Sequence, residues 1–386
     1  MKQNKAYRYR LYPNKIQANL IDRTIGCVRF IYNCMLADKI KHYEETKQSL
    51  KNYPAQYKNE HPFLKEVDSL ALANAQLNLQ SAYSNFFRRI KQGKEKEKEK
   101  SGFPKFKSKR RAKWSYTTNN QKNSIRIENN TIRLPKVESV KVKLHRSIPN
   151  NCIIKSVTVT KTRTNKYYIS ILIEYENQVV KKNIETAIGL DFSMKKLYTD
   201  SNNYSADYPK YFRNSQDSLA KEQRIFSHRK LGSNRYNKQR VKVARVHEYI
   251  SNQRKDFLHK ESRKIANNFD LVCIEDLDMQ EMSKHFNFGK SIADNSWGMF
   301  VTFLKYKLED RGKHLVTIDK WFPSSKTCNV CKEINHNLTL NQREWTCKCG
   351  IKLNRDFNAA INILNFGLES IKTIGTIGLA QRYLSH

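Results

Sequence analysis

Three acidic residues lie where an apolar segment ends or begins, so that their charge can leave the protein core. Asp191 lies near the end of AIGLDF, Glu275 ends LVCIE, and Asp356 opens DFNAAINIL. Carboxylates that meet at one point repel one another unless cations lie between them. Two Mg²⁺ ions about 4 Å apart would bind there and contact both the attacking and the leaving oxygen of a phosphodiester. The pattern therefore predicts a phosphodiester-cleaving site that holds two Mg²⁺ ions.

Each acid also has a simpler interpretation. Asp356 is suited to capping the N-terminus of a helix, Glu275 can be surface charge within EDLD, and Asp191 can begin a turn. Nearby acids compete for the same catalytic role, namely Asp200, Asp276 and Asp278. The pattern alone does not decide between these alternatives.

Four of the eight cysteines form two closely spaced pairs, Cys328 with Cys331 and Cys347 with Cys349. Paired cysteines on two turns supply the four soft, tetrahedral ligands that Zn²⁺ prefers. Four protein ligands leave no open position for a substrate, so we predict a structural zinc site rather than a catalytic one. The scattered cysteines have apolar neighbours and are interpreted as small buried hydrophobic side chains: Cys27, Cys34, Cys152 and Cys273.

The charge of the chain indicates a polyanionic partner. Its 386 residues include 72 Lys and Arg against 36 Asp and Glu, a formal charge of +36, beyond the roughly 2 to 8 that suits a small soluble domain. Cations occur along the whole chain, which favours nucleic acid over a membrane, and aromatic residues at 11% offer stacking surfaces for bases. The sequence contains neither an apolar run of bilayer length nor a secretory signal, so we expect a cytoplasmic protein with no membrane partner.

The elements that must position these residues follow an α+β, multidomain pattern. KAYRYRLYP alternates as a strand, and two helical runs follow, one from Asn14 and one from Leu70 to Phe86. Residues 115–175 have the alternation of strands, and they are predicted to close a small barrel with the first strand. From Thr186 the pattern is mixed α/β. Helices are predicted at 211–268 and 292–311, with a last helix that ends at Gly367.

Several segments, in order, resemble the TnpB family, the OrfB proteins of insertion sequences and relatives of miniature type V CRISPR effectors. Similar to its three RuvC motifs are GLDFSMKKLYTDS, VCIEDLDM and NRDFNAAINIL, and similar to its zinc ribbon are FPSSKTCNVC and WTCKCG. The start of the chain and the segments GFPKFKSKRR and IRLPKVESVKVKLHR also resemble family regions, so the resemblance covers essentially the whole chain. One departure is the C-x-C spacing of Cys347 and Cys349, where C-x-x-C is common.

The resemblance implies four domains. They are a β-barrel wedge domain (1–12 and 114–182), a helical recognition domain (13–113), an RNase H-like RuvC nuclease domain (183–324 and 352–386) and an inserted zinc ribbon (325–351). It also implies that Asp191, Glu275 and Asp356 are the metal-binding carboxylates. The expected cofactors are two Mg²⁺ ions at these acids and one structural Zn²⁺ ion at the cysteines.

Members of this family bind a guide RNA transcribed from the transposon end, recognise a short motif beside the target and cut both DNA strands. We therefore expect guide RNA and double-stranded DNA as partners, one monomer for each guide RNA, and association with the bacterial nucleoid. Two alternatives remain open: a transposase that joins DNA strands with the same acids, and an RNA-guided repressor that has lost cleavage.

Two groups of residues are predicted to contact nucleic acid. By alignment with relatives, the motif beside the target is approached by Ser69, Leu70 and Ala73 and by Tyr116, Thr117, Thr118 and Asn119. The second group is basic and alternates with aromatic residues, as in surfaces that bind single strands: Lys105, Lys107, Arg110 and Arg111.

Overall fold

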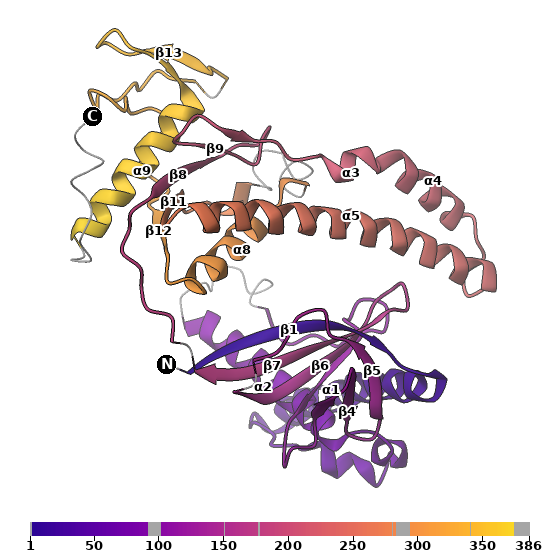
Figure 1. Ribbon diagram of the computed structural model, residues 1–386. Helices are drawn as coiled ribbons and strands as arrows, with labels where there is room; N and C mark the ends of the chain where they lie inside the picture. The colour runs from indigo at the N-terminus through magenta and orange to yellow at the C-terminus, as the bar shows by residue number, and fades with distance from the viewer. Residues whose placement is uncertain are drawn as a thin grey trace. The chain divides into compact units, whose positions relative to one another are not determined.

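The computed structural model divides the chain into two compact units, Met1–Gln178 and Val179–His386 (Figure 1). Each unit has its own hydrophobic core and is described by itself. None of the helices in the described part of the chain is long and apolar enough to cross a membrane. The described residues are 2–91, 102–149, 151–176, 178–279, 281–282, 294–339 and 341–373.

The first unit is a seven-stranded antiparallel sheet with two long helices inserted after its first strand. The strand order is β2-β6-β7-β1-β5-β4-β3, so the N-terminal strand β1 lies inside the sheet, between β7 and β5. Its elements are β1 Lys2–Tyr12, α1 Lys15–Thr46, the 3₁₀ turns η1 Pro54–Lys58 and η2 Pro62–Lys65, α2 Ser69–Lys91, β2 Ser115–Asn119, β3 Arg126–Glu128, β4 Thr131–Leu134, β5 Glu138–Lys143, β6 Cys152–Lys161 and β7 Tyr167–Glu176.

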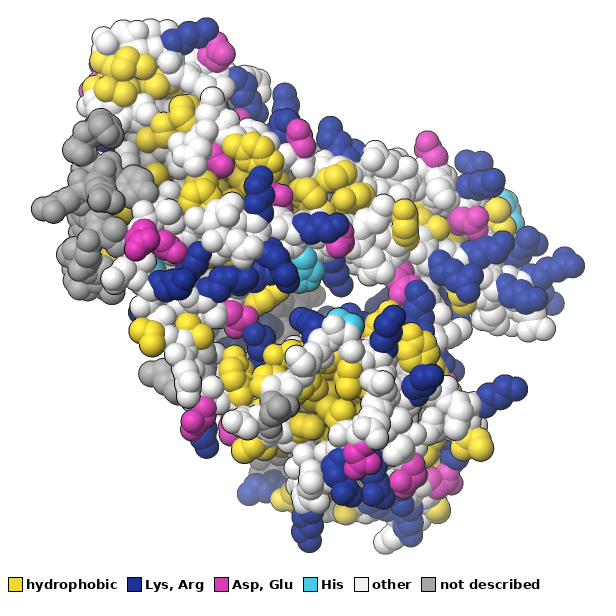
Figure 2. Space-filling view, viewed as in Figure 1, with side chains coloured by type: hydrophobic (Ala, Val, Ile, Leu, Met, Phe, Trp, Pro, Cys, Tyr) yellow, Lys and Arg dark blue, Asp and Glu magenta, His cyan; other side chains and the backbone are white. Residues whose placement is uncertain are grey.

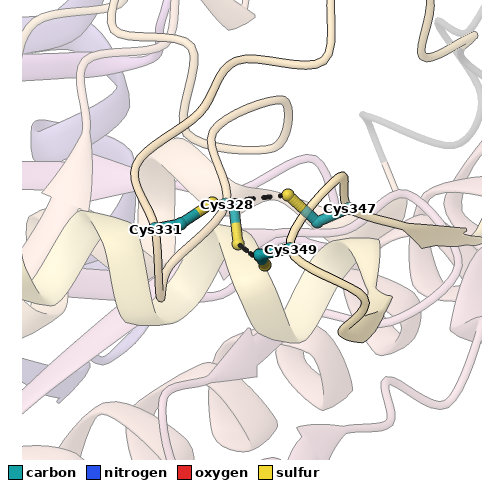
Figure 3. A group of neighbouring side chains, drawn as sticks. All are labelled: Cys328, Cys331, Cys347 and Cys349. Atoms are coloured by element: carbon teal, nitrogen blue, oxygen red, sulfur yellow. Dashed lines mark hydrogen bonds between the residues drawn. The ribbon is translucent and has the colours of Figure 1, made fainter.

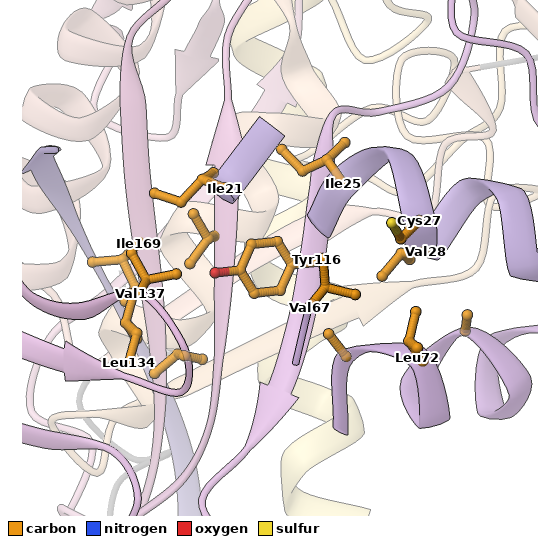
Figure 4. Close-up of a cluster of buried hydrophobic side chains, with 14 of the residues drawn as sticks. Ile21, Ile25, Cys27, Val28, Val67, Leu72, Tyr116, Leu134, Val137 and Ile169 are labelled. Atoms are coloured by element: carbon orange, nitrogen blue, oxygen red, sulfur yellow. The ribbon is translucent and has the colours of Figure 1, made fainter. Parts of the chain in front are cut away.

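Local sequence explains where these elements begin. The spacing of apolar residues changes from the period of a strand to that of a helix at Asn14. The Asn14 side chain accepts a hydrogen bond from the Gln17 backbone, and the Gln17 side chain accepts one from the Asn14 backbone, so the two residues cap α1. On α1, Ile21, Ile25 and Val28 belong to the buried cluster that also contains Tyr116 of β2 and Leu72 of α2 (Figure 4). The helices therefore cover one face of the sheet.

The predicted barrel is not closed in the described residues. The outer strands β2 and β3 lie at opposite edges of the sheet and are not hydrogen-bonded to each other. The sheet therefore forms a half-barrel. Alternation in the sequence sets which face of each strand is buried, but it does not determine whether two edge strands meet.

The second unit has a five-stranded mixed sheet, ordered β10-β9-β8-β11-β12, in which β8, β11 and β12 are parallel. Its elements are β8 Ala187–Phe192, β9 Tyr198–Asp200, β10 Ser205–Ala206, α3 Tyr211–Asn214, α4 Gln216–Ser227, α5 Asn234–Asn268, β11 Leu271–Glu275, α8 Trp297–Glu309, β12 His314–Ile318, β13 Glu344–Thr346, β14 Lys352–Asn354 and α9 Arg355–Thr373.

Helices cover both faces of this sheet, which explains why its central strands are apolar throughout. Ile188 and Val272 face the helices α5 and α8, whereas Ala187 and Cys273 face α9. Figure 1 shows α9, in yellow, on the opposite side of the strands from α5 and α8. The charged ends of these apolar strands are therefore the places where polar side chains can gather.

Helix α9 does not end at Gly367, contrary to the prediction, but continues to Thr373. A Cβ atom on Gly367 would lie 2.3 Å from Sγ of Cys273, and one on Gly189 would lie 2.2 Å from the Ala360 carbonyl oxygen. Glycine is required at both positions because α9 packs directly on β8 and β11. The helix predicted at 292–311 is shorter than expected: α8 begins at Trp297, after Ser296 in the left-handed conformation. Residues 292–293 lie outside the described part.

Candidate active site and cysteine cluster

Asp191 and Glu275 lie at the ends of neighbouring parallel strands. In the register of β8 and β11, Leu190 is paired with Ile274, so the next residue on each strand is one of the two acids. Both strands are buried until they reach the acid, and both acidic side chains are half-buried. The parallel pairing thus aligns the two carboxylates at the same edge of the sheet.

Asp356 joins them from the first turn of α9. The helix is capped by Asn354, whose Oδ1 accepts a hydrogen bond of 3.1 Å from the Phe357 backbone. Asp356 is therefore not the cap, and its carboxylate is paired instead with the Arg343 guanidinium at 3.0 Å and 3.3 Å. Because α9 packs on β8, this acid is brought toward the ends of the strands.

The three acids interact electrostatically, although their carboxylate oxygens are not as close to one another as the four cysteine sulfurs are. Burial raises the pKa of Asp191 well above its usual range, and the charges of Glu275 and Asp356 raise it further, against Arg355 and Arg343. Burial also raises the pKa of Glu275, although Oγ of Ser324 donates a hydrogen bond of 2.5 Å to its Oε1. The site has too little positive charge for three ionised carboxylates, which suits a divalent cation with oxygen ligands.

The competing acids have other roles in the structure. Asp200 is buried and accepts hydrogen bonds from the backbone N–H groups of Asn202 and Tyr204, so it holds the β9–β10 turn. Asp278 accepts a hydrogen bond from the Glu281 backbone, and Asp276 is exposed. These contacts separate the three candidate acids from their neighbours in sequence, which the pattern could not do.

Sequence reasoning did not find Ser324, Arg343 or Asn295. Ser324 and Arg343 contact Glu275 and Asp356, and the buried Asn295 amide donates to the carbonyls of Ser193 and Lys196, which follow Asp191. The only sequence indication was their place in segments that flank the motifs, FPSS, REW and ADNSW. Their roles depend on contacts between segments that are distant in sequence.

The four clustered cysteines meet as predicted. Their sulfur atoms all lie within 4.8 Å of one another, with Cys328 to Cys349 at 3.9 Å and Cys331 to Cys347 at 3.4 Å (Figure 3). Four sulfurs at the usual Zn–S distance in a tetrahedron would be about 3.8 Å apart. The shorter C-x-C spacing therefore still allows four sulfurs to converge on one ion.

Two tight turns produce this convergence. Lys332 follows the first pair and Gly350 the second, both with positive φ, and their backbone N–H groups donate to the carbonyls of Cys328 and Cys347. Burial alone would raise the pKa of the Cys328 thiol, but backbone N–H groups of Cys331 and Val330 lower it to about 7. A thiol that ionises readily near neutral pH is a good zinc ligand.

The cysteine cluster is attached directly to the helix that carries Asp356. The buried Asn358 and Asn362 amides on α9 both donate to the Thr327 carbonyl, at 2.7 Å and 2.6 Å. In return, Oδ1 of Asn358 accepts from the Asn329 backbone at 2.9 Å. The segment that carries the cysteines also carries Ser324 and Arg343, so it shapes the acidic site.

The predicted nucleic-acid contacts in the first unit are only partly accessible. Ser69 is exposed at the start of α2, and Leu70 and Ala73 are half-buried. On β2, Tyr116 and Thr118 face the core (Figure 4), so direct contact by these two side chains is excluded in this conformation. Their neighbours on the other face of β2, Thr117 and Asn119, are partly accessible. The alternation of a strand at the surface of a core explains the difference.

The basic group also divides. Lys105, Arg110 and Arg111 are exposed. Lys107 is half-buried, its ammonium lies 3.7 Å from the centre of the Tyr32 ring, and burial lowers its pKa. Lys107 thus helps to fix the loop on α1, while the other three cations face solvent.

A further basic surface lies on α5. Arg235, Lys238, Lys242 and Arg245 are all exposed, and their spacing of three, four and three residues places them on one face of the helix. No acidic residue occurs from His228 to His247. Figure 2 shows Lys and Arg side chains crowded over the hairpin of α4 and α5, at the right of the view. This row of cations, the α5 basic face, has the charge needed to follow a phosphate backbone.

Three parts of the chain match family models. Residues 170–285 match a model described as "Probable transposase". Residues 297–363 match one described as "Cas12f1-like, TNB domain", and residues 1–48 match a helix-turn-helix domain model. The second match includes the four cysteines and Asp356.

Two curated proteins align over nearly the whole chain. A Streptomyces pristinaespiralis protein named "Putative RNA-guided DNA endonuclease" is 35% identical, with 95% of this chain and 90% of the relative covered. InsQ of Escherichia coli (strain K12), with the same name, is 29% identical, with 95% and 93% covered. A solved Cas12f1 chain from a complex with sgRNA and target DNA is 13% identical, covers 94% of this chain and 99% of its own length, and has a TM-score of 0.52; this likeness concerns the fold alone.

Proposed function

The chain belongs to the TnpB family, related to Cas12f, and from this premise we propose that it is an RNA-guided DNA endonuclease with Asp191, Glu275 and Asp356 in its active site. One observation carries the proposal: strand register aligns Asp191 with Glu275 at the ends of β8 and β11, and Asp356 joins them from α9, so that Asp191 interacts electrostatically with both. Isolated surface acids would not interact in this way. Carboxylates held together at the cost of repulsion favour a cation site.

The arrangement of the strands supports an RNase H-like, RuvC-type nuclease domain. Three parallel strands and two antiparallel strands form the sheet, and the acids lie at the ends of two central strands and at the start of the covering helix. In this domain division the wedge, recognition and zinc-ribbon domains keep the boundaries expected from the sequence. The cysteines hold a structural Zn²⁺ ion that fixes the ribbon next to Asp356.

The donor set fits Mg²⁺, which prefers carboxylate oxygens. When bound, two Mg²⁺ ions would lower the pKa of an attacking water and neutralise charge on the phosphate. Asp191, Glu275 and Asp356 hold the ions, and the Ser324 hydroxyl orients Glu275 through its hydrogen bond. Asn295 holds the segment after Asp191 in place through two backbone carbonyls.

Arg343 provides positive charge at the edge of the site. Its guanidinium is about half exposed and is already paired with Asp356. In this position the Arg343 guanidinium offsets part of the negative charge of the carboxylates before cations bind. Its exposed part remains open to a phosphate oxygen. We assign it to charge balance around the reacting phosphate.

Sequence specificity comes from base pairing to a guide RNA derived from the transposon end, while the protein contacts the backbones and a short motif beside the target. The α5 basic face and the exposed Lys105, Arg110 and Arg111 provide the cations for these backbones. The contacts to the motif beside the target are assigned to Ser69, Leu70, Ala73, Thr117 and Asn119, with Tyr116 and Thr118 supporting them from the core.

The test begins with the RNA that copurifies with the protein. Its sequence defines a matching plasmid target, which is incubated with the purified complex and Mg²⁺. We expect linear DNA from wild type and from Asp276→Ala, and none from Asp191→Ala, which should still bind RNA and DNA. Joined rather than cut products would support a transposase, and binding without cleavage by wild type would support a repressor; either result overturns the nuclease assignment.

A further inference from the structure

An exposed tryptophan lies three residues before Ser324, which contacts Glu275 of the candidate active site. Trp321, in the loop that follows β12, is 80% exposed, whereas the next residue, Phe322, packs inward on Phe366 of α9 with ring centres 4.6 Å apart. An indole ring is large and apolar, so leaving it in water forgoes the stabilisation that burial would give. Neither the core nor the proposed metal site requires a tryptophan at this position.

The loop that carries Trp321 is held at several points. The Trp321 backbone N–H donates to Oδ1 of Asp319 at 2.7 Å, and the Ser324 N–H donates to the Phe322 carbonyl at 2.8 Å. Oγ of Ser324 then contacts Glu275. Trp321 and Ser324 are three residues apart, so their Cα atoms lie within about 11 Å of each other. The loop backbone at Trp321 is therefore held within about 11 Å of Ser324, which contacts Glu275, and the indole ring projects from it into solvent.

A cation accompanies the ring. The Lys320 ammonium lies 4.9 Å from the centre of the Trp321 ring. An aromatic face beside a cation is the combination that proteins use for single-stranded nucleic acid, because every base can stack on the ring and the cation pairs with the phosphate. The α5 basic face supplies charge for a backbone, but the ring near the acids adds a surface for an unpaired base.

We propose that Trp321 stacks on an unpaired base of the DNA strand that enters the acidic site, and that Lys320 pairs with the adjoining phosphate. The stack fixes the position of the strand relative to Asp191, Glu275 and Asp356. Trp321 is then a substrate-positioning residue rather than a catalytic one. This inference rests on the proposed nuclease function.

Tyr204 offers a matched control within the same unit. It is also an exposed aromatic residue with a lysine over its ring, at 4.2 Å from Lys264. It lies in the β9–β10 turn. The Ser201 backbone N–H of that turn donates to the Gly189 carbonyl, two residues before Asp191 on β8, so the turn lies back along the strand from its acidic end. Tyr204→Ala should therefore leave cleavage unchanged. Trp321 is mostly exposed, so Trp321→Ala should fold normally.

The experiment uses the complex with its copurified RNA and a set of synthetic DNA targets. Each target carries a single abasic site, at successive positions of the DNA strand that does not pair with the guide RNA. We expect Trp321→Ala to raise KM by about tenfold, as for the loss of one base–aromatic stack, with little change in kcat. Trp321→Phe should retain most of the affinity. One abasic position should slow wild type by a similar factor and have no added effect on Trp321→Ala.

The outcomes separate this inference from the proposed function. Unchanged kinetics of Trp321→Ala, or equal abasic penalties in wild type and variant, would overturn the stacking assignment while Asp191→Ala remains inactive. Cleavage by Asp191→Ala would overturn the proposed active site instead. A second measurement does not depend on cleavage. In EDTA, an oligothymidylate should quench the tryptophan fluorescence of wild type more than that of the Trp321→Phe variant. Equal quenching of the two proteins would contradict the stack.

Discussion

The cysteine cluster and the acidic cluster both gather groups suited to a metal, but they are assembled in opposite ways. The four cysteines come from one short segment, and two turns bring their sulfurs together. The three acids come from β8, β11 and the start of α9, and only the packing of these elements unites them. The first cluster is therefore a local structure, whereas the second is a product of the fold.

The two clusters also differ in how their charge is set. Backbone N–H groups within the same turn lower the pKa of the Cys328 thiol to about 7 against the effect of burial. At Asp191, burial and the charges of distant residues raise the pKa. At Cys328 the turn itself therefore supplies groups that stabilise the thiolate, whereas the acidic cluster begins with repulsion that cations from solution must relieve. Four predictions test this contrast.

The largest effect is expected from Cys328→Ser. Zinc content should fall from about one ion per chain to nearly none, because a closed site depends on all four ligands. Folding free energy from structural zinc is roughly 10–16 kcal/mol in zinc-finger peptides, so the ribbon should unfold locally. Metal analysis checks the content and hydrogen exchange checks the ribbon. Cys152→Ser, in the first unit, is the control; bound zinc in Cys328→Ser would contradict the four-cysteine site.

Glu275→Gln should lower Mg²⁺-dependent cleavage by roughly a hundredfold or more, because the variant loses one of the carboxylate charges that bind Mg²⁺. Bound metal ions stabilise the charge of the transition state by several kcal/mol. Its zinc content should be that of wild type, because the four cysteines bind their ion without Glu275. Cleavage rates against Mg²⁺ concentration provide the measurement. Asp276→Asn changes the next, exposed acid and should have no effect. Equal losses in both variants would rule out a specific role for Glu275.

Asp191→Asn should change the pH dependence of stability without metal. A raised pKa means that the folded chain binds the proton more tightly than the unfolded chain. Wild type in EDTA should therefore lose stability as pH rises from the ordinary Asp pKa of about 3.9 toward the raised pKa of Asp191. The Asp191→Asn variant should not show this loss of stability, because asparagine does not titrate. Hydrogen exchange of β8 and β11 at pH 5 and 7 measures it. Mg²⁺ should restore protection in wild type only; parallel pH profiles would contradict the account.

The smallest effect is expected from Arg343→Gln. Arg343 lowers the pKa of Asp191 and pairs with Asp356, so its loss leaves the carboxylates less compensated. For a partly exposed pair, stability without metal should fall by less than about 1 kcal/mol. Stabilisation by added Mg²⁺ should correspondingly increase. Lys348→Gln breaks the exposed pair with Glu333 on the same ribbon and serves as control; if it responds to Mg²⁺ in the same way, the effect is not specific to the acids.

Periodicity predicted most of the helices and strands, since it reflects the face that each element buries. It failed where contacts between elements decided the outcome. Gly367 has the sequence appearance of a helix end, yet it lies inside α9 because Cys273 leaves no room for a side chain. The alignment with relatives predicts that Tyr116 and Thr118 contact nucleic acid together with their neighbours, but strand alternation, which periodicity does predict, turns these two side chains into the core.

The sequence by itself determined the cysteine cluster, because its ligands and turns lie within one segment and need only local backbone geometry. It also determined the excess positive charge and the three acids as candidates. Only the tertiary structure decided which acids come to the same edge of the sheet, that Asn354 rather than Asp356 caps α9, and that Ser324 and Arg343 contact two of these acids. The physical reason is range: hydrogen bonds within a turn are set by neighbouring residues, whereas repulsion among distant carboxylates exists only after strands and helix have packed.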